Sequence, residues 1–267
     1  MRKVTKMDQA MNVGDLFSIK GKIALVTGGS RGIGLMIARG FVSAGAKVYV
    51  SSRKKEVCDG VAEELSAIGA CYSIPADVST AEGCARLAGE LSAREERLHI
   101  LVNNAGAAWG APFAEYPEAG FDKVMDTNVK ALFFLTRDLA PLLEKAASPG
   151  DPSRVVNIGS IDGIKVPSVE NYAYAPSKAA VHHLTRMLAV NLGPRGITVN
   201  AIAPGPFPSQ MTKWLLENFQ KKIEADCPLG RIGEPEDMAG VAIYLASRAG
   251  AYVNGVTIPV DGGLCIT

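Results

Sequence analysis

The chain of 267 residues has no long apolar run and no block of like charges, and its formal net charge is only +1. A membrane-spanning helix needs about 20 consecutive apolar residues, and a nucleic-acid surface needs clustered cations. Neither a membrane span nor nucleic-acid binding is therefore expected. The first residues, "MRKVTKMDQAMNVGDLFSIKGK", are basic but lack the apolar core of a signal peptide. We expect a cytoplasmic protein that acts on a small molecule, with an organellar transit peptide as the alternative.

Cysteine and histidine are scarce. The five cysteines are scattered and form no C-x-x-C pair, which favours free thiols in a reducing compartment over a metal or redox site. No metal site is expected. The three histidines are His99, at the start of a predicted strand, and His182 and His183, inside a predicted helix. We interpret them as structural or exposed residues rather than as proton donors.

Short β-branched apolar runs alternate with longer amphipathic stretches along the chain. The runs predict seven strands, at 22–29, 47–52, 71–76, 99–106, 154–160, 197–205 and 256–263. Helical spacing predicts helices at 33–44, 55–68, 81–94, 119–145, 177–192 and 235–247. Strands that are apolar on both faces and separated by helices indicate a parallel sheet covered on both sides. We expect one doubly wound α/β domain of the Rossmann type, with seven parallel strands, over residues 21–267, preceded by a loose extension over 1–20.

The first predicted strand runs into "VTGGSRGIG", whose glycines open a predicted helix. Glycines at Gly28, Gly32 and Gly34 let the backbone turn tightly and approach a pyrophosphate, and the helix N-terminus attracts its charge. The alternative is a turn without a ligand. A nucleoside-triphosphate loop is excluded because the Gly-Lys-Ser/Thr sequence is missing.

The residues after the second predicted strand indicate which dinucleotide binds. NAD sites of this type place Asp or Glu about 20 residues beyond the glycines, whereas this chain has "SSRKK" at 51–55. Arg53, supported by Arg31, suits a 2′-phosphate, so NADP(H) is the expected cofactor; the alternative is a solvated helix start. Asp77, at the end of the third strand, either accepts from an adenine amino group or caps the helix that begins near Thr80.

The stretch "NYAYAPSK" offers two tyrosines as proton donors beside one lysine. Residues four apart share a helix face, whereas residues six apart point away from each other. Tyr174 and Lys178 are four apart and Tyr172 and Lys178 are six apart, so Tyr174 is the candidate acid if the helix has begun by then. Pro176 fits a first turn.

Three motifs in order resemble the short-chain dehydrogenase/reductase family over residues 21–263. They are "TGGSRGIG" (27–34), "NNAG" (103–106) and "YAPSK" (174–178). The resemblance implies a catalytic set of Asn128, Ser160, Tyr174 and Lys178. In that set Ser160 holds the substrate oxygen, Tyr174 donates the proton, Lys178 lowers the tyrosine pKa and grips the nicotinamide ribose, and Asn128 fixes a water.

The glycine turn and the resemblance together predict the residues that contact the cofactor. They are Gly28, Ser30, Arg31, Gly32, Ile33, Gly34, Ser52, Arg53, Lys54, Asp77, Val78, Asn104, Ala105, Gly106, Tyr174, Lys178, Pro204, Gly205 and Phe207.

The segment after "APG" (203–205) bears on the substrate. An extra "PFP" delays Thr212, which puts the family's contact to the nicotinamide carboxamide in doubt. Met211, Trp214, Leu215 and Phe219 fall at helical spacing and predict either an apolar lid over the substrate or a helix packed on the core. With Trp109, Phe113 and Phe207, they favour an apolar or acyl-like substrate.

Within the family, the chain most resembles the 3-oxoacyl reductase branch typified by the β-ketoacyl reductase of the rhamnolipid pathway. This implies an NADPH-dependent reductase of a 3-oxoacyl thioester or related ketone. The alternatives are a polyol or sugar-acid dehydrogenase of the family and a non-catalytic NADP-binding sensor or scaffold; an enoyl reductase is disfavoured because its Tyr and Lys are more than four apart. Arg195 matches a position that contacts acyl carrier protein in related reductases, and a homotetramer is implied.

Overall fold

The computed structural model describes residues 11–267 of the chain. Residues 1–10, half of the expected loose extension, lie outside the described residues. In the other half, α1 (Val13–Phe17) is a short helix with its N-terminus capped by the Asn12 side chain. The Phe17 ring lies 6.5 Å from that of Tyr244, and Ile19 is fully buried, so this part of the extension packs on the domain.

Seven parallel strands form one sheet, as the sequence predicts. In the order β3-β2-β1-β4-β5-β6-β7 they are β3 (Cys71–Ser73), β2 (Lys47–Ser51), β1 (Ile23–Thr27), β4 (Ile100–Asn103), β5 (Ser153–Ile158), β6 (Ile197–Pro204) and β7 (Thr257–Val260). Every residue of β4, β5 and β6 is buried, because helices cover both faces. The predicted doubly wound α/β fold is confirmed.

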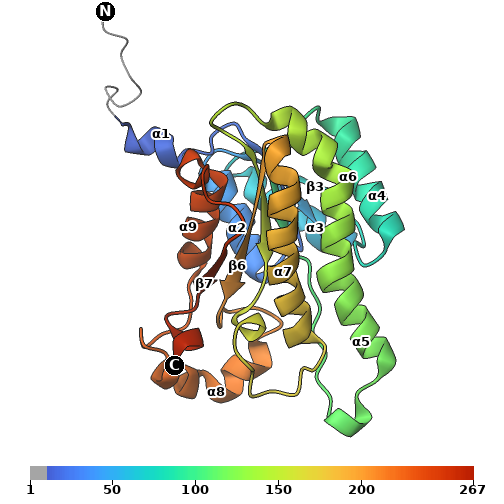
Figure 1. Ribbon diagram of the computed structural model, residues 1–267, viewed down its shortest axis with the longest axis vertical. Coiled ribbons are helices and arrows are strands. Elements are labelled where there is room, and N and C mark those ends of the chain that lie inside the picture. The colour runs from blue at the N-terminus through green and yellow to red at the C-terminus, as the bar shows by residue number, and fades with distance from the viewer. Residues whose placement is uncertain (1–10) are drawn as a thin grey trace, which may run out of the picture.

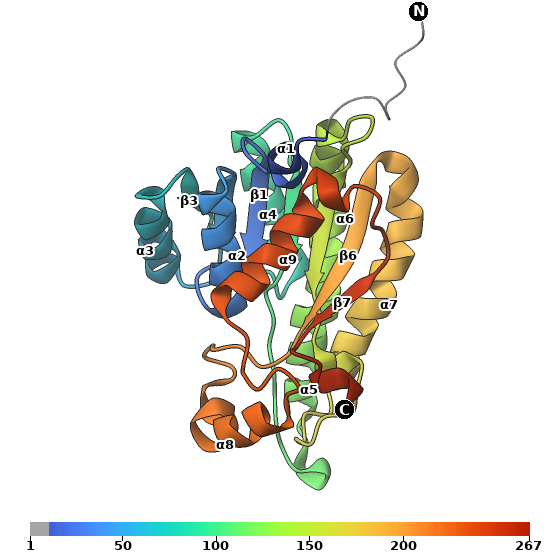
Figure 2. The same cartoon turned by 90° about the vertical axis from the view of Figure 1, so that its left-hand side faces the viewer.

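Two apolar layers hold the helices on the sheet. On one face α2 (Gly32–Ser43), α3 (Lys55–Ser66) and α9 (Pro235–Ala246) pack on one set of strand side chains. On the other face α4 (Ala81–Arg94), α6 (Ala131–Ala146) and α7 (Tyr174–Leu192) pack on the alternate set, because successive side chains of a strand point to opposite faces. Figure 2 shows α2 and α9 in front of the sheet, with α4 and α6 behind it.

The strand order reverses between β1 and β4. The chain runs outward from β1 through β2 to β3 and then returns to place β4 on the other side of β1. Ligands of doubly wound folds bind outside the carboxyl ends of the strands at such a switch point. That end of the sheet is the lower end in Figure 1, where α8 (Lys213–Asp226), the loop before α7 and the C-terminus gather.

The sequence predicts a single helix over 119–145, and the prediction is wrong because the helix is not a continuous α-helix. The segment consists of α5 (Glu118–Met125), a π-helical turn η3 (Asp126–Lys130) and α6. A π turn inserts an extra residue and rotates the side chains that follow, and such turns are frequent at functional sites. Here the π turn contains Asn128, which is 3% exposed.

A buried arginine holds the opposite end of the sheet to α9. Arg154, on β5, is 1% exposed, and its guanidinium donates to the carbonyl of Leu245 in the last turn of α9 (3.1 Å) and to that of Ser247, the C-cap of α9 (2.9 Å). It also bonds Asp151 at 3.0 Å, which Lys22 holds from the other side at 2.9 Å. Cations at a helix C-terminus satisfy carbonyls that lack a partner within the helix.

Candidate active site

The glycine turn between β1 and α2 has the shape that a close ligand requires. Gly28 and Gly32 have φ angles of +63° and +51°, which side chains rarely tolerate. A Cβ on Gly34 would overlap the carbonyl oxygen of Gly28 and the amide of Asn104. Asn104 donates to the carbonyls of Thr27 (2.9 Å) and Gly28 (3.2 Å), so the predicted "NNAG" segment fixes the turn.

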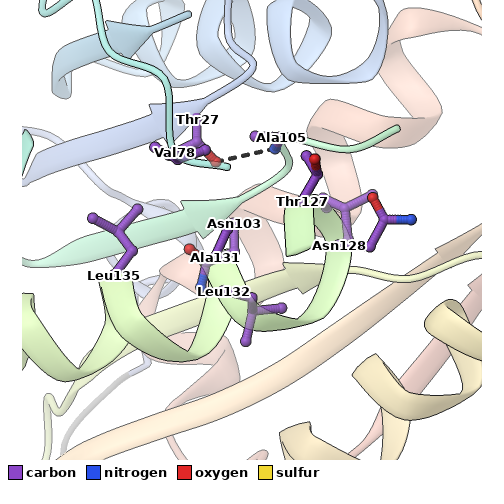
Figure 3. Close-up of a pocket in the computed structure, with 10 residues that line it drawn as sticks. Thr27, Val78, Asn103, Ala105, Thr127, Asn128, Ala131, Leu132 and Leu135 are labelled. Carbon is purple, nitrogen blue, oxygen red and sulfur yellow. Dashed lines mark hydrogen bonds between the residues drawn. The ribbon is translucent and has the colours of Figure 1, made fainter. Parts of the chain in front are cut away.

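Thr27 joins the two strands that flank the switch point, and the sequence reading missed it. Its hydroxyl accepts from the backbone N–H groups of Asn104 and Ala105, both at 3.0 Å, and donates to Val102 at 3.2 Å. Figure 3 shows Thr27 and Ala105 beside a small cavity that Val78 and Asn128 also line. The signal was present in the sequence, as the Thr of "TGGSRGIG".

The N-terminus of α2 is open to an anion. Arg31 is the N-cap, but no side chain among residues 11–267 caps this helix end, which leaves the first-turn N–H groups of Gly32, Ile33 and Gly34 without side-chain partners. Ser30 is 8% exposed, whereas Arg31 is exposed. Positive φ angles, close-packed glycines and an uncapped helix start together fit a dinucleotide pyrophosphate.

The end of β2 carries groups that fit a phosphate. The hydroxyls of Ser51 and Ser52 are buried without a hydrogen-bond partner among the described residues. Arg53 is exposed beside them, and Lys54 is the N-cap of α3.

Asp77 lies near Arg53, beyond β3. Its Oδ1 accepts from the backbone N–H (3.1 Å) and the hydroxyl (2.8 Å) of Ser79. Thr80 itself caps α4, by accepting from Gly83 at 3.0 Å. The capping alternative for Asp77 is therefore wrong, and its carboxylate lies exposed at the carboxyl edge of the sheet.

Tyr174 is the first residue of α7, so the condition for pairing it with Lys178 is met. Ser160 follows β5, and its hydroxyl accepts from the backbone N–H of Asp162 at 3.1 Å. Burial raises the pKa of Tyr174 to about 12; the Ser160 hydroxyl works against this rise, and the Asp162 carboxylate adds to it. The prediction of a lowered Tyr174 pKa is therefore wrong for the protein without cofactor, because desolvation of the phenolate dominates.

Lys178 lies deep in the same site. It is 5% exposed, and its Nζ lies 5.5 Å from the ring centroid of Tyr174. The ammonium donates to the carbonyl of Ile158, at the end of β5, at 2.8 Å. Burial lowers the pKa of Lys178 to about 8, opposed by the Asp162 carboxylate, so the ammonium form predominates at pH 7.

The Asn128 side chain links the π turn to α7. Its Oδ1 accepts from the backbone N–H of Ala107 (2.8 Å), and its Nδ2 donates to the carbonyl of Ala107 (3.0 Å) and to Ser177 Oγ (2.9 Å). Ser177 in turn donates to the carbonyl of Tyr174 at 2.6 Å. The sequence reading missed Ser177, although it lies inside "YAPSK". Both N–H groups of Asn128 are committed to protein atoms that position α7 and the turn after "NNAG".

Tyr172 lies outside this arrangement. It is 41% exposed, and its hydroxyl donates to Glu170 at 3.0 Å. Its ring packs edge-on against Phe113 at 5.5 Å and Tyr116 at 5.8 Å. The hydroxyl of Tyr116 accepts from the backbone N–H of Ala173 at 3.3 Å, which ties this aromatic cluster to the start of α7.

The segment after β6 contains the helix α8, which has no buried residue. Every residue of α8 is exposed or half-buried, so the alternative of a helix packed on the core is wrong. Phe207 is 1% exposed in the core, so it can offer a ligand only its main chain. The Thr212 hydroxyl closes the turn by bonding the carbonyl of Phe207 at 2.5 Å. Pro204 and Gly205 lie at the carboxyl end of β6.

The histidines lie where the sequence reading puts them. His99 Nδ1 accepts from the backbone N–H of Ile23 at 3.0 Å, and His183 is exposed. His182 is buried beside Gly159 and Gly163, and burial lowers its pKa to about 4. No helix among residues 11–267 is both long and apolar enough to cross a membrane.

The chain is similar to known proteins over nearly its whole length. A family model described as "Enoyl-(Acyl carrier protein) reductase" matches residues 28–265. The chain is 52% identical over 250 residues to the rhamnolipids biosynthesis 3-oxoacyl-[acyl-carrier-protein] reductase of Pseudomonas aeruginosa, covering 92% of this chain and 97% of that protein. It is 35% identical over 261 residues to gluconate 5-dehydrogenase of Gluconobacter oxydans, covering 95% and 98% respectively.

Solved structures are also similar to this chain over nearly its whole length. The Pseudomonas aeruginosa RhlG/NADP active-site complex superimposes with a TM-score of 0.91 at 50% identity, over 96% of this chain and 100% of that chain. A gluconate 5-dehydrogenase from Burkholderia cenocepacia, in complex with NADP and tartrate, gives 0.89 at 31% identity, over 96% and 100%.

The glycine turn at a strand-order switch point defines a dinucleotide-binding α/β protein. Within that class, the chain belongs to the short-chain dehydrogenase/reductase family.

Proposed function

We propose that this chain is an NADPH-dependent oxidoreductase that reduces a 3-oxoacyl thioester, or a related ketone, to the 3-hydroxy product. The observation that carries the proposal is the first turn of α7. It holds Tyr174 beside Ser160 and, one turn later, the buried ammonium of Lys178. The 3-oxoacyl-[acyl-carrier-protein] reductase of Pseudomonas aeruginosa, 52% identical to this chain, supports the substrate class.

The chain's own residues would hold the cofactor in four places. The glycine turn from Gly28 to Gly34 receives the pyrophosphate, and the cations at Arg31, Arg53 and Lys54 with the Ser52 hydroxyl receive a 2′-phosphate. Asp77 and Val78 flank the adenine. The segments Asn104 to Gly106 and Pro204 to Phe207 flank the nicotinamide side. When bound, NADPH supplies the hydride that the carbonyl carbon accepts.

Proton transfer follows from the site geometry. The Ser160 hydroxyl hydrogen-bonds the carbonyl oxygen of the substrate, and Tyr174 donates its phenolic proton to that oxygen. The phenolate left behind is stabilised by the Lys178 ammonium and by Ser160, which offsets the cost of a buried anion. Asn128 acts through Ser177 and Ala107 and is a positioning residue in this scheme.

A substrate panel tests the proposal. Purified protein with NADPH is given 3-oxoacyl thioesters, simple ketones and keto-sugars, and the loss of nicotinamide absorbance is followed. Reduction of the 3-oxoacyl thioesters with the highest kcat/KM is expected. Preference for keto-sugars would favour the polyol or sugar-acid alternative, and tight NADPH binding without reduction of any carbonyl would favour the sensor alternative. Equal Kd values for NADPH and NADH would refute the cofactor assignment.

The proposal extends to two partners. Arg195 is exposed but ion-paired with Glu144, so an acyl carrier protein would bind by taking over or surrounding that pair. A homotetramer is supported by exposed apolar side chains on α5, α6 and α7, at Phe121, Phe133 and Val190. Light scattering of the purified protein tests the tetramer, and kcat/KM for carrier-protein against coenzyme A thioesters tests the carrier protein.

A further inference from the structure

Asp162 places a half-buried carboxylate two residues after Ser160. It belongs to the 3-10 turn η4 (Ile161–Gly163), which packs closely on α7: a Cβ on Gly163 would lie 2.7 Å from the carbonyl carbon of Lys178. The Oδ2 of Asp162 accepts from Asn171 Nδ2 at 3.3 Å, and the carbonyl of Asn171 accepts from the backbone N–H of Tyr174 at 2.8 Å. The carboxylate therefore lies between the Ser160 turn and the start of α7.

Direct pairing does not neutralise this carboxylate. Burial raises the pKa of Asp162, and the Asn171 amide and the cations of Lys165 and Lys178 oppose that rise. Lys165 donates to the carbonyl of Leu264 and Lys178 to that of Ile158, so neither bonds the carboxylate. Among residues 11–267, Asp162 forms no ion pair within 4.0 Å. The field of its charge reaches the reacting groups, since it raises the pKa of Tyr174 and opposes the lowering of the pKa of Lys178.

We propose that Asp162 is a specificity-determining residue that excludes substrates with a carboxylate close to the reacting carbonyl and admits their neutral esters and thioesters. Like charges repel more strongly in a partly desolvated site than in water. The inference rests on the proposed function, because it concerns the substrate class of the same site. It also separates that function from the sugar-acid alternative, whose substrates are anions.

A matched pair of substrates tests the charge preference. Acetoacetate and its N-acetylcysteamine thioester carry the same 3-oxo group and differ in charge. The ratio of kcat/KM, thioester over acid, is measured with NADPH for the wild type, Asp162→Asn and Glu170→Gln. We expect Asp162→Asn to lower this ratio at least about tenfold. If Asp162→Asn also changes the proton affinity of Tyr174, kcat/KM changes by the same factor for both substrates, so the ratio is unaffected.

Glu170→Gln is the control, because it removes the same charge from an exposed side chain on the neighbouring loop. It should leave the ratio within about twofold, since exposed charges are screened. A ratio that Asp162→Asn leaves unchanged, or that Glu170→Gln lowers equally, would overturn the inference.

A binding measurement separates this inference from the proposed function. 3-Hydroxybutyrate and its N-acetylcysteamine thioester are titrated into the NADPH-loaded protein by calorimetry, a combination that cannot turn over. Asp162→Asn should bind the acid at least about tenfold more tightly relative to the thioester than the wild type does. If the wild type reduces no 3-oxo thioester, the proposed function fails, and the relative affinity for the acid still decides the role of Asp162; no gain in that affinity refutes it.

Discussion

Replacing each tyrosine of "YAY" in turn separates chemistry from packing. Tyr174→Phe removes one hydroxyl and keeps the ring, so the 5.5 Å contact with the Lys178 ammonium and the start of α7 are preserved. The lost group is the buried proton donor that interacts with Ser160. Tyr172→Phe removes a hydroxyl of the same kind from an exposed ring, where its partner is Glu170.

The expected magnitudes differ by orders of magnitude. A positioned general acid contributes about 10²–10⁴-fold to a rate, which corresponds to ~3–5 kcal/mol of transition-state stabilisation. We expect kcat to fall by about that factor in Tyr174→Phe. Tyr172→Phe should keep kcat within about threefold of the wild type, because exposed polar contacts contribute little.

The assay is kcat at saturating NADPH and 3-oxoacyl thioester, with the Kd for NADPH measured by fluorescence for each variant. Unchanged NADPH affinity shows that the site is intact in Tyr174→Phe. Equal losses in both variants, or a larger loss in Tyr172→Phe, would refute the assignment of the acid.

Three further predictions concern charge, backbone and core. The kcat/KM for reduction should fall as pH rises through about 8, because Lys178 then loses the proton whose charge stabilises the phenolate; a flat profile to pH 9 would contradict this. Gly34→Ala should weaken NADPH binding and destabilise the fold by about 1–3 kcal/mol, because the added Cβ overlaps Gly28 and Asn104. Gly89→Ala, in open space on α4, should stabilise the fold by about 0.5–1 kcal/mol. Urea unfolding measures both changes. Arg154→Met should lower the free energy of unfolding by about 3 kcal/mol, because it leaves the carbonyls of Leu245 and Ser247 without their buried donor, whereas Asp151 keeps Lys22. A loss below ~1 kcal/mol would show that water replaces the guanidinium.

The strands and the acid were predictable because short-range patterns determine them. Six of the seven observed strands lie inside the predicted apolar runs, and β5 begins one residue earlier, at Ser153, since a parallel sheet covered on both faces demands continuous apolar sequence. Tyr174 was chosen by counting four residues to Lys178, and the observed start of α7 makes that count valid.

Contacts between distant segments were not predictable in this way. The π turn at Asn128 interrupts a helix whose periodicity alone looks continuous, and the burial of Phe207 depends on Gly233, which packs against its ring. The direction of the Tyr174 pKa shift was also missed. Sequence spacing shows which charge is near the phenol, but the desolvation that outweighs it depends on the whole packed site.

The start of α7 shows why this site needs the complete fold. Its first turn is held from three directions: Ser177 bonds Asn128 of the π turn, Asn171 bonds Asp162 of the turn after β5, and Ala173 bonds Tyr116 of the loop after β4. Each bond joins segments that are far apart or separated by a loop, and each fixes the backbone within three residues of the phenol. Because a proton donor must lie within hydrogen-bond reach of its acceptor, a small shift at any of the three would reduce catalysis without touching the substrate.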